Sequence, residues 1–526
     1  MDRRRFIQTF PFAAAGLFSA SPARAAEPAY FVVLSDSAVL ISPSRLSSAS
    51  RTRSLSLAGA VAAAMKAGKP LNILPGVYRT SGFSIAAPLE IFAAPGTVII
   101  EPAGGECFNI DIRPAADSDW LEGVTIKGVG FRGKGAILPA GLNRRERPVN
   151  PFLEAAIPRF NALITAFRVR NLIVEHCSIG GSQAGGLALW RCRNASVARN
   201  EFLNNNISIY SAQGENNLFA DNDIHDNANF AIMVEQWPPA PDYTLLRNNR
   251  IAQTAASFGA DPPRGIVGGS GPYGNGVFGL YAHHMTVEGN RIMDSAFSGV
   301  RMNGCSNVQI ANNAIDRSGE TAIMVECPQT DGKTPNGLGY EGGVIANNIV
   351  SGAAEGVSVT NGWYGGRRVS ITGNQVGSIR RRTFRTSDPN WPRYATYGDG
   401  IYAEADVDIV GNIVEDCDGC GMYVAPMAIQ NSPIKTAANV TGNIVKGARW
   451  GVGFWKGSDP ALGFTFIQGN MITGSSRGAI MALSPSGSPN DGTRTEDDGR
   501  DYGTAKDDLK ADKPYPVVTI GVNYAF

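Results

Sequence analysis

The sequence predicts an all-β protein, a right-handed parallel β-helix of about 11 or more coils with a capping helix at its N-terminal end. A short pattern recurs from about residue 170: a small residue, a short apolar strand, a polar turn, and then an asparagine followed by an apolar pair. The chain also has 62 Gly and only 18% charged residues, a composition typical of many short strands joined by tight turns. Repeat and composition together argue against a mainly helical fold.

Residues 1–25 are predicted to be a signal peptide. Arg3-Arg4-Arg5-Phe6-Ile7 precedes the apolar run Phe10–Phe18, and Ala23-Arg24-Ala25 is a small-x-small cleavage site. The paired arginines and the aromatic residue after them resemble twin-arginine signals, which direct folded proteins across the inner membrane. The resemblance implies that the twin-arginine export machinery is a partner of the precursor and that the mature protein is periplasmic or secreted.

Charge and hydropathy argue against a nucleic acid partner and against a transmembrane segment. Removal of residues 1–25 takes away four arginines and one aspartate, which changes the formal net charge from +1 to −2. An exported, slightly acidic chain is poorly suited to bind nucleic acid. No later segment approaches the roughly 18 uninterrupted apolar residues of a transmembrane helix. We therefore expect no nucleic acid partner and no transmembrane segment in the mature chain.

Residues 26–140 are predicted to form the N-terminal cap and the first coils. The Ala-rich amphipathic segment Leu55–Ala67 predicts a helix, and Leu71–Tyr78 predicts the strand after it. These motifs resemble the helix and first strand that close the N-terminal end of pectate-lyase-like β-helices. A helix at this position would cover apolar side chains and strand edges that the first coil otherwise exposes.

Residues 141–485 are predicted to form the main β-helix. The repeated turn asparagines are Asn200, Asn222, Asn249, Asn290, Asn313, Asn348, Asn374, Asn412, Asn443 and Asn470. The shortest spacings are 22 and 23 residues, so one coil has about 22 residues. A period in this range admits a leucine-rich repeat or a β-helix, and the absence of a Leu-x-x-Leu-x-Leu frame favours the β-helix.

The asparagines are interpreted as structural. Asparagine tolerates left-handed turn geometry, and its side-chain amide can hydrogen-bond to its copy in the next coil. The strands alternate within a coil, so Val300 and Met302 are expected to point inward and Arg301 and Asn303 to face solvent. Stacked coils would then bury one continuous apolar column.

Residues 486–526 are predicted to be a polar, acidic tail that ends in one strand, Val517–Phe526, and caps the C-terminal end. Seven cysteines are too few for a disulfide scaffold. Cys417-x-x-Cys420 lacks a second such pair or a nearby histidine for zinc. A local disulfide and two buried thiols are both consistent with it.

Alignment of the coils predicts a solvent-facing row of candidate functional residues. Its members are Trp190, Tyr210, Glu235, Leu280, Asn303, Glu326, Thr360, Glu404, Ala425 and Trp455. A neighbouring outward row contains Arg301, Tyr402 and Tyr423. Aromatic rings stack on apolar sugar faces, and carboxylates bind hydroxyls or transfer protons, so this pattern favours a polysaccharide site. The candidate substrate-binding residues are Glu235, Trp190, Tyr210, Tyr402, Tyr423 and Trp455.

Four residues form the candidate catalytic group: Glu326, Glu404, Asp399 and Arg301. Neighbouring coils lie about 4.8 Å apart, so the backbones of Glu326 and Glu404, two coils apart, would be separated by about 10 Å. Converging side chains would approach the roughly 6.5 to 9.5 Å of an inverting hydrolase pair. Arg301, one coil before Glu326, is suited to hold a substrate carboxylate or to neutralise charge in a lyase, and Asp399 precedes the strand of Glu404.

The sequence indicates no cofactor and assigns no metal site. Asp221-x-Asp223-x-His225-Asp226 offers oxygen ligands for calcium, but it overlaps a turn-asparagine position and lacks a repeated nonapeptide pattern. Long inserts flank the row at Trp237–Tyr243, Ser257–Asn275, Pro328–Gly343 and Gly377–Gly398. The last contains the basic segment Ile379–Arg385, which is suited to grip an anionic polymer.

The signal, the capping segment and the repeats from Val169 to Leu483 together resemble a bacterial family of twin-arginine-translocated repetitive β-helix proteins. That family has no established activity, so the resemblance implies export and fold. The chain lacks the combination found in polygalacturonases, a paired Asp followed by Gly-His-Gly and Arg-x-Lys, and it lacks the Asp-Pro-His of alginate epimerases. Three functions stay open: an enzyme acting on an anionic polysaccharide (lyase, hydrolase or epimerase), a noncatalytic glycan-binding protein, and an envelope structural or assembly component.

Overall fold

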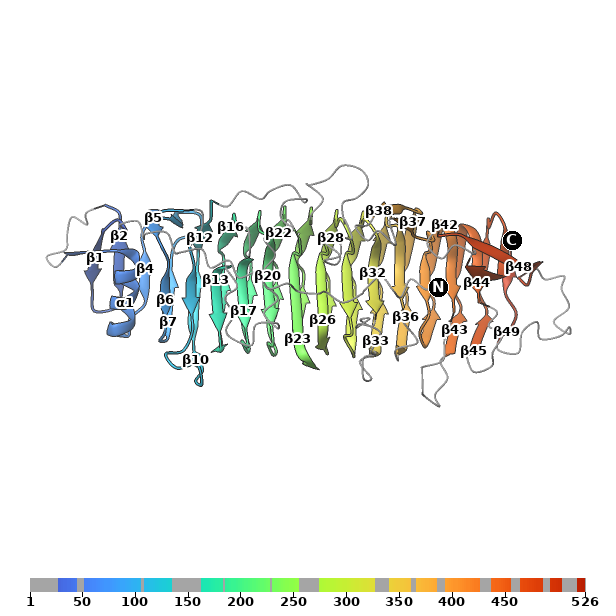
Figure 1. The fold of residues 1–526 in the computed structure, drawn as a ribbon, viewed down its shortest axis with the longest axis horizontal. Helices are drawn as coiled ribbons and strands as arrows, with labels where there is room; N and C mark the ends of the chain where they lie inside the picture. The colour runs from blue at the N-terminus through green and yellow to red at the C-terminus, as the bar shows by residue number, and fades with distance from the viewer. Residues whose placement is uncertain are drawn as a thin grey trace. The chain divides into compact units, whose positions relative to one another are not determined.

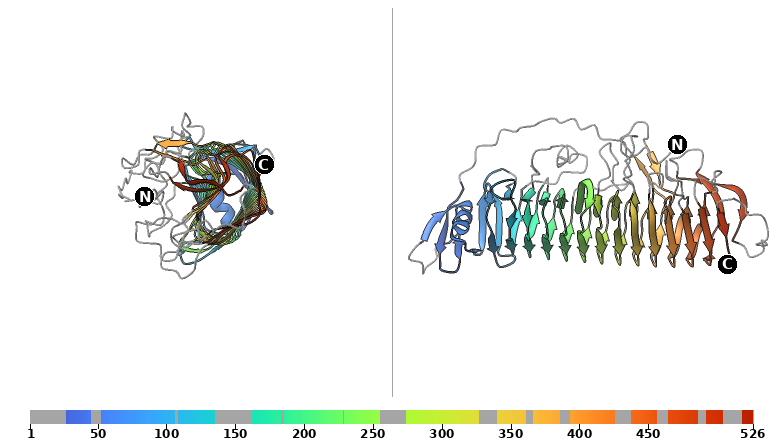
Figure 2. Two further views of the ribbon diagram at one scale, coloured as in Figure 1. Left: turned by 90° about the vertical axis from the view of Figure 1, so that its right-hand side faces the viewer. Right: turned by 90° about the horizontal axis from the view of Figure 1, so that it is seen from below.

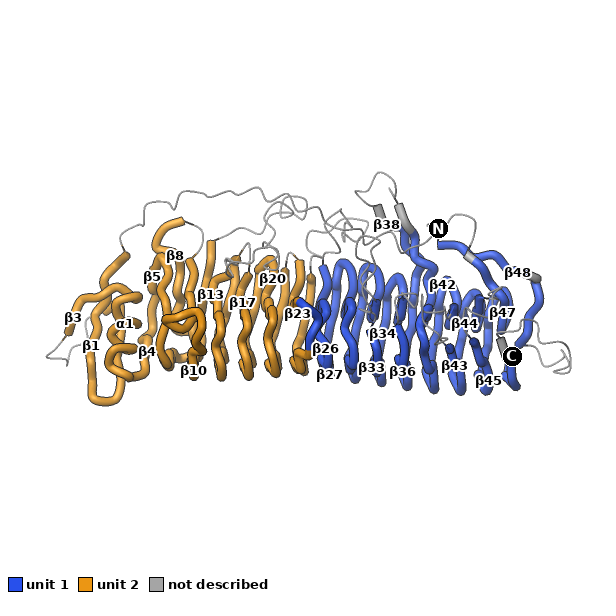
Figure 3. The backbone as a smooth tube through the Cα atoms, turned by 60° about the horizontal axis from the view of Figure 1, so that its bottom comes forward, with its two compact units in different colours: residues 1–11, 238–240, 259–526 blue, residues 12–237, 241–258 orange. Residues whose placement is uncertain are grey.

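The computed structural model describes most of the chain after the predicted signal peptide, which lies outside the described residues. These residues are 27–44, 52–105, 108–134, 162–182, 185–227, 229–254, 274–326, 340–360, 366–385, 393–425, 437–455, 464–485, 492–503 and 518–525. They divide into two compact units (Figure 3). The N-terminal unit comprises residues 12–237 and 241–258, and the C-terminal unit comprises residues 1–11, 238–240 and 259–526.

The N-terminal unit opens with three antiparallel strands, in which β1 (Tyr30–Leu34) pairs with β2 (Val39–Ser42) and β3 (Thr52–Leu55). The helix α1 (Leu57–Ala67) follows and lies beside the first coil (Figure 1). Its first turn is capped by Ser56, whose hydroxyl accepts a hydrogen bond from the backbone N–H of Gly59 at 3.1 Å. The helix buries one apolar face and contacts β2, β5 and β6. The predicted capping helix is therefore confirmed.

The coils of the N-terminal unit each contribute strands to three parallel faces. The first face contains β4 (Leu71–Ile73), β7 (Leu89–Phe92), β11 (Val124–Lys127), β15 (Ile173–Glu175), β18 (Ser196–Ala198), β21 (Leu218–Ala220) and β24 (Leu245–Arg247). The second contains β5 (Gly76–Thr80), β8 (Val98–Pro102), β12 (Val129–Arg132), β16 (Ser178–Gly180), β19 (Glu201–Leu203), β22 (Asp223–His225) and β25 (Arg250–Ala252). The third, which carries the candidate residues, contains β6 (Phe83–Ile85), β9 (Ile110–Ile112), β13 (Ala162–Phe167), β17 (Gly185–Trp190), β20 (Ile207–Ala212) and β23 (Ile232–Pro241).

The C-terminal unit repeats this three-faced arrangement (Figure 2). Its first face contains β27 (Thr286–Glu288), β30 (Val308–Ala311), β33 (Glu341–Ala346), β36 (Arg367–Thr372), β41 (Val407–Val410), β43 (Ala437–Thr441), β45 (Phe464–Gln468) and β49 (Val518–Ile520). The second contains β28 (Arg291–Met293), β31 (Ala314–Asp316), β34 (Ile349–Ser351), β37 (Gln375–Ile379), β46 (Met471–Thr473), β50 (Tyr524–Ala525) and the first halves of β42 (Ile413–Val424) and β44 (Ile444–Phe454).

The third face of the C-terminal unit contains β26 (Val277–His283), β29 (Val300–Asn303), β32 (Thr321–Glu326), β35 (Glu355–Val359), β40 (Ile401–Ala403), the second halves of β42 and β44, and β47 (Gly478–Pro485). Within the acidic tail, β48 (Arg494–Asp501) turns back and pairs antiparallel with β47. The predicted terminal strand is divided into β49 and β50, which join different faces. The described strands of the tail thus pair with strands of the last coils.

An asparagine ladder runs through the interior of each unit. In the N-terminal unit the Asn222 amide nitrogen donates to Oδ1 of Asn249 at 3.0 Å and to the Val197 carbonyl at 2.9 Å. In the C-terminal unit the same bonding links Asn290 through Asn470 and continues to Asn523. The structural interpretation of the repeated asparagines is therefore confirmed.

The left-handed turn residue, however, is the one before each ladder asparagine. Arg199 (φ 56°) precedes Asn200 and Asp221 (φ 55°) precedes Asn222. The ladder asparagines themselves therefore do not adopt the left-handed geometry that asparagine tolerates. Their buried amides are needed because they satisfy backbone groups of neighbouring coils, which would otherwise lack partners in the interior.

The cysteine pair Cys417 and Cys420 is present as two buried thiols, which decides between the two predicted states. Burial raises the pKa of both thiols, so they pack as small apolar side chains. Among the described residues, no helix combines the length and hydropathy needed to cross a membrane.

Candidate functional site

The register of the third face places the predicted carboxylates of the C-terminal unit in one row. Asn303 pairs with Glu326, and the register of β32, β35 and β40 puts Glu326, Thr360 and Glu404 in successive coils. Glu326 and Glu404 therefore lie two coils apart, with backbones separated by about 10 Å. This part of the coil alignment agrees with the prediction.

The alignment of Tyr210 is wrong by two residues. Trp190 pairs with Ala212, and Ala212 pairs with Glu235, so these three form the row in the N-terminal unit. Tyr210 pairs instead with Ala188 and lies two positions earlier in its strand. The error arises because β20 follows two asparagines, so no leading small residue marks the start of this strand.

The prediction that these rows face solvent is also wrong. The exposed fraction is 1% for Glu235, 5% for Arg301, 1% for Glu326, 0% for Asp399 and 6% for Glu404. The aromatic residues Trp190, Tyr210, Tyr402 and Tyr423 are buried as well, and Trp455 is half-buried. Alternation identifies side chains that point away from the apolar column, but it does not show which neighbours cover them.

Arg301 and Glu326 form a buried ion pair. The Nε of Arg301 donates to Oε1 of Glu326 at 2.6 Å, and Nη2 lies 2.5 Å from the same oxygen. The guanidinium carbon lies 5.1 Å from the ring centroid of Phe297. Burial raises the pKa of Glu326, while the charge and hydrogen bond of Arg301 oppose that shift. Both of these polar contacts of Arg301 are thus with Glu326, and they hold its carboxylate in place.

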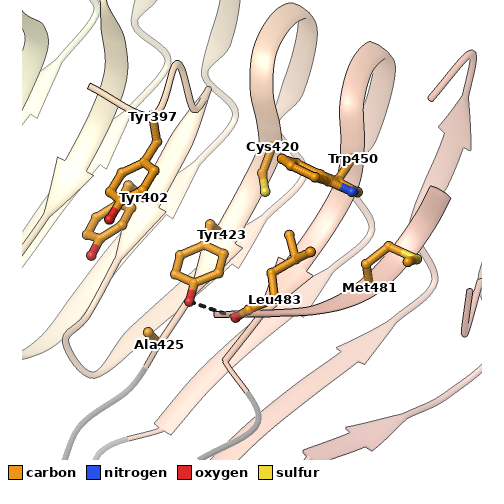
Figure 4. Close-up of a cluster of buried hydrophobic side chains, with 8 residues drawn as sticks. All are labelled: Tyr397, Tyr402, Cys420, Tyr423, Ala425, Trp450, Met481 and Leu483. Atoms are coloured by element: carbon orange, nitrogen blue, oxygen red, sulfur yellow. Dashed lines mark hydrogen bonds between the residues drawn. The ribbon is translucent and has the colours of Figure 1, made fainter. Parts of the chain in front are cut away.

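Glu404 has a neutral partner on its own strand. The hydroxyl of Tyr402 donates to Oε1 of Glu404 at 2.6 Å. The Tyr402 ring stacks between Tyr397, at 6.2 Å between centroids, and Tyr423, at 5.6 Å. These tyrosines belong to a buried cluster (Figure 4). A rigid aromatic stack therefore orients the phenol that binds Glu404.

Asp399 is bound by an arginine that the coil alignment missed. Arg494 of β48 donates through Nη1 to Oδ1 of Asp399 at 2.8 Å, and its Nη2 contacts the other carboxylate oxygen. The Arg494 guanidinium lies 3.9 Å from the ring centroids of both Tyr397 and Tyr423. Arg494 is one of five Arg and Lys residues in the tail, so the tail sequence carries no signal that singles it out. The four predicted catalytic residues therefore occupy three separate contacts: Arg301 with Glu326, Tyr402 with Glu404, and Asp399 with Arg494.

The N-terminal unit holds a buried carboxyl beside a phenol. The hydroxyl of Tyr210 donates to Oε1 of Glu235 at 2.6 Å. Burial raises the pKa of Glu235 to about 8, although the hydrogen bond from Tyr210 acts in the other direction. Tyr210 and Trp190 pack in one apolar cluster with Phe167. Burial therefore favours the protonated form of Glu235, which is the form that can donate a proton.

The candidate calcium ligands are engaged in local contacts. Asp223 binds Arg250 at 2.8 Å, and Nδ1 of His225 lies 2.7 Å from Asp226. Over the described ranges, no three His, Cys, Asp or Glu side chains are grouped so that they could hold a metal ion.

Two arginines of the basic segment Ile379–Arg385 bind residues of the coils. Arg380 binds Asp416 at 2.5 Å, and Nη1 of Arg382 donates to the carbonyls of Ser318 and Gly319. The insert also contains the antiparallel pair β38 (Thr383–Arg385) and β39 (Arg393–Ala395). Most of the predicted inserts Ser257–Asn275 and Pro328–Gly343 lies outside the described residues.

Stacked parallel coils with an internal asparagine ladder define a parallel β-helix protein. The chain belongs to the family described as right handed beta helix region, whose profile matches residues 160–261 and 269–487. No curated protein matches the chain in sequence.

Several solved structures are similar at low sequence identity. The A-module of the Azotobacter vinelandii mannuronan C-5 epimerase AlgE6 is 12% identical, with 89% of this chain and 94% of that chain covered and a TM-score of 0.38. The catalytic unit of a GH87 alpha-1,3-glucanase from Streptomyces thermodiastaticus strain HF3-3 is 14% identical, with coverage of 83% and 64% and a TM-score of 0.38. PfbA, a surface adhesin of Streptococcus pneumoniae, is 12% identical, with coverage of 84% and 90% and a TM-score of 0.40.

Proposed function

We propose that this chain acts on an anionic polysaccharide as a lyase, hydrolase or epimerase. The observation that carries the proposal is the placement of Glu326 and Glu404 in one row, two coils apart, with different partners. Arg301 favours the charged form of Glu326, whereas Glu404 is bound by the neutral Tyr402. Two carboxyls held in different environments are suited to divide acid and base roles.

In the proposed reaction Glu326 and Glu404 share the acid and base roles. A backbone separation of about 10 Å allows converging side chains to reach the roughly 6.5 to 9.5 Å of an inverting hydrolase pair. The same two groups could remove and return a proton in a lyase or an epimerase. Asp399 has a positioning role, because its bond to Arg494 fixes the turn before the strand of Glu404.

Glu404→Gln is expected to lower turnover about 100-fold or more, because glutamine keeps the oxygen that accepts from Tyr402 but transfers no proton. The test incubates the purified protein with a panel of neutral and anionic polysaccharides. Reducing ends and unsaturated-uronate absorbance are followed together, and NMR detects epimerisation.

The control is Glu415→Gln, which removes an exposed carboxylate of the same unit and should leave turnover unchanged. Glu326→Gln is read together with a thermal unfolding curve, because it also breaks the ion pair with Arg301. Full turnover in both the Glu404 and Glu326 variants would remove this site assignment.

A second candidate function is that of a noncatalytic glycan-binding, structural or assembly protein of the envelope. Tyr402 and Tyr423 are buried, and Tyr423 contacts Arg494. This burial favours the noncatalytic function, because the two rings then stabilise the coils. Absence of product across the polysaccharide panel, including the NMR assay, would support this function over the enzyme.

We also propose that the chain belongs to the twin-arginine-translocated β-helix proteins and is periplasmic or secreted. The support is the Arg3–Ile7 motif and the cleavage site at Ala23–Ala25. Lysine at both Arg3 and Arg4 should retain the precursor in the cytoplasm, which cell fractionation measures. Normal export of that variant would contradict this route.

A further inference from the structure

Two arginines lie in successive coils of the N-terminal unit, directly after the strands of the third face. Arg168 follows the last residue of β13, and Arg191 follows the last residue of β17. Both have left-handed backbone geometry, each with a φ of 51°. The Arg168 N–H donates to the carbonyl of Trp190, so the two arginines occupy adjacent coils about 4.8 Å apart.

These arginines differ from others on the same unit in their partners. Arg170, Arg193, Arg199 and Arg250 bind the carboxylates of Glu122, Glu215, Glu175 and Asp223. Within the described part of the chain, Arg168 and Arg191 contact no carboxylate. The Nε of Arg168 is buried and has no hydrogen-bond partner there. A buried donor without a partner is unfavourable, and an oxygen atom of a ligand would satisfy it.

A tryptophan two coils further along is tied to Arg191. Trp237 of β23 is 46% exposed. Gln213 donates to the Trp237 carbonyl at 2.6 Å and accepts a hydrogen bond from Nε of Arg191 at 2.7 Å. This bond uses only Nε of Arg191. Its two terminal Nη groups form the edge that binds carboxylates in a bidentate manner.

Buried polar contacts hold the segment that contains Trp237 and Tyr243. The side chain of Gln236 donates to Oδ2 of Asp242 and to the carbonyl of Gly214, both at 2.7 Å. Trp237 directly follows Gln236, and Tyr243, which is 50% exposed, directly follows Asp242. Exposed aromatic rings on a well-anchored segment can bind sugar rings without a large loss of conformational entropy.

We propose that Arg168, Arg191, Trp237 and Tyr243, here called the arginine–tryptophan strip, bind an acidic polysaccharide along the coils of the N-terminal unit. The two guanidinium groups bind carboxylates on successive sugars, and the aromatic rings contact the sugar faces. The choice of a glycan as the ligand rests on the proposed function. The strip itself is a separate binding site, because the proposed catalytic carboxylates belong to the C-terminal unit.

The test measures binding of the full protein to polygalacturonate and to alginate, with dextran as the neutral polymer, by affinity electrophoresis at increasing salt. The wild-type protein should be retarded by an acidic polymer and not by dextran, and salt should weaken the retardation. The double variant Arg168→Asn/Arg191→Asn should bind about tenfold more weakly or worse, because two charge-assisted bonds are lost. Trp237→Ala should also weaken binding.

Asparagine is chosen because it tolerates left-handed geometry. The matched control is Arg199→Asn, since Arg199 is also left-handed, with a φ of 56°, but binds Glu175. Equal retardation of the double variant, Arg199→Asn and wild type would overturn the strip, as would failure of the wild type to bind either acidic polymer. Loss of turnover in Glu404→Gln with unchanged binding by the double variant would leave the proposed function intact and reject the strip alone. Binding that depends on the strip, together with no turnover of any polysaccharide, would support the strip and reject the proposed enzyme.

Discussion

Replacement of Arg494 by leucine is expected to lower the free energy of unfolding by about 3–5 kcal/mol, because it leaves a buried carboxylate without its counter-ion. The exposed fraction is 1% for the Arg494 side chain and 0% for that of Asp399. The guanidinium also contacts the rings of Tyr397 and Tyr423, and these contacts are lost together with the ion pair. Urea denaturation of the wild type and the variant measures the difference.

Two variants separate the buried charge from other effects of the substitution. Arg500→Leu changes an exposed arginine of the same strand and should alter stability by less than about 0.5 kcal/mol. Asp399→Asn combined with Arg494→Leu should recover much of the loss. Asparagine keeps an oxygen that accepts the Cys420 N–H, which is bonded at 2.8 Å, without a buried charge. A loss below about 1 kcal/mol in Arg494→Leu would contradict the burial of this pair.

The role of Arg494 limits where a sugar can contact the C-terminal unit. Arg494 of β48 packs against the rings of Tyr397 and Tyr423. Gly492 (φ 63°) lets the chain approach closely, since a Cβ there would lie 2.3 Å from the Thr396 carbonyl oxygen. Tyr402 and Tyr423 are therefore packed against protein. For the proposed enzyme, sugar contacts are therefore not expected from these two rings.

The fold could be predicted from sequence because its signals are local and repeated. Each ladder asparagine bonds to the equivalent residue one coil later, so the period of the sequence is also the period of the structure. The capping helix has its own local signals, a serine cap and an alanine-rich apolar face. Such features need no knowledge of distant residues.

The candidate site could be predicted only in part, because its contacts join residues that the repeat does not relate. The spacing of Glu326 and Glu404 follows from the repeat and agrees with the register. Arg494 and Asp399 are 95 residues apart in sequence, and nothing in the coil pattern links them. Burial likewise depends on such distant partners, so alternation alone gave the direction of Glu326 but not its environment.

The stability of the protein is expected to decrease as pH rises from about 4.5 to about 8, through the titration of Glu235. Burial raises its pKa from 4.5 to about 8, so the folded state holds a proton that the unfolded state releases at lower pH. The contribution is fully favourable below pH 4.5, is lost progressively across this interval, and is constant above it. The shift corresponds to a change on the order of 5 kcal/mol, measured by urea denaturation at several pH values.

Variants of the carboxyl and of its partner test the assignment to Glu235. Glu235→Gln removes the titrating group and should flatten this part of the pH profile, whereas Glu201→Gln, an exposed position of the same unit, should leave it unchanged. Tyr210→Phe removes a hydrogen bond that favours the charged carboxylate, so the decrease should extend to higher pH. A profile that Glu235→Gln leaves unaltered would mean that the carboxyl is already ionised at neutral pH, and Glu235 could not then serve as a proton donor.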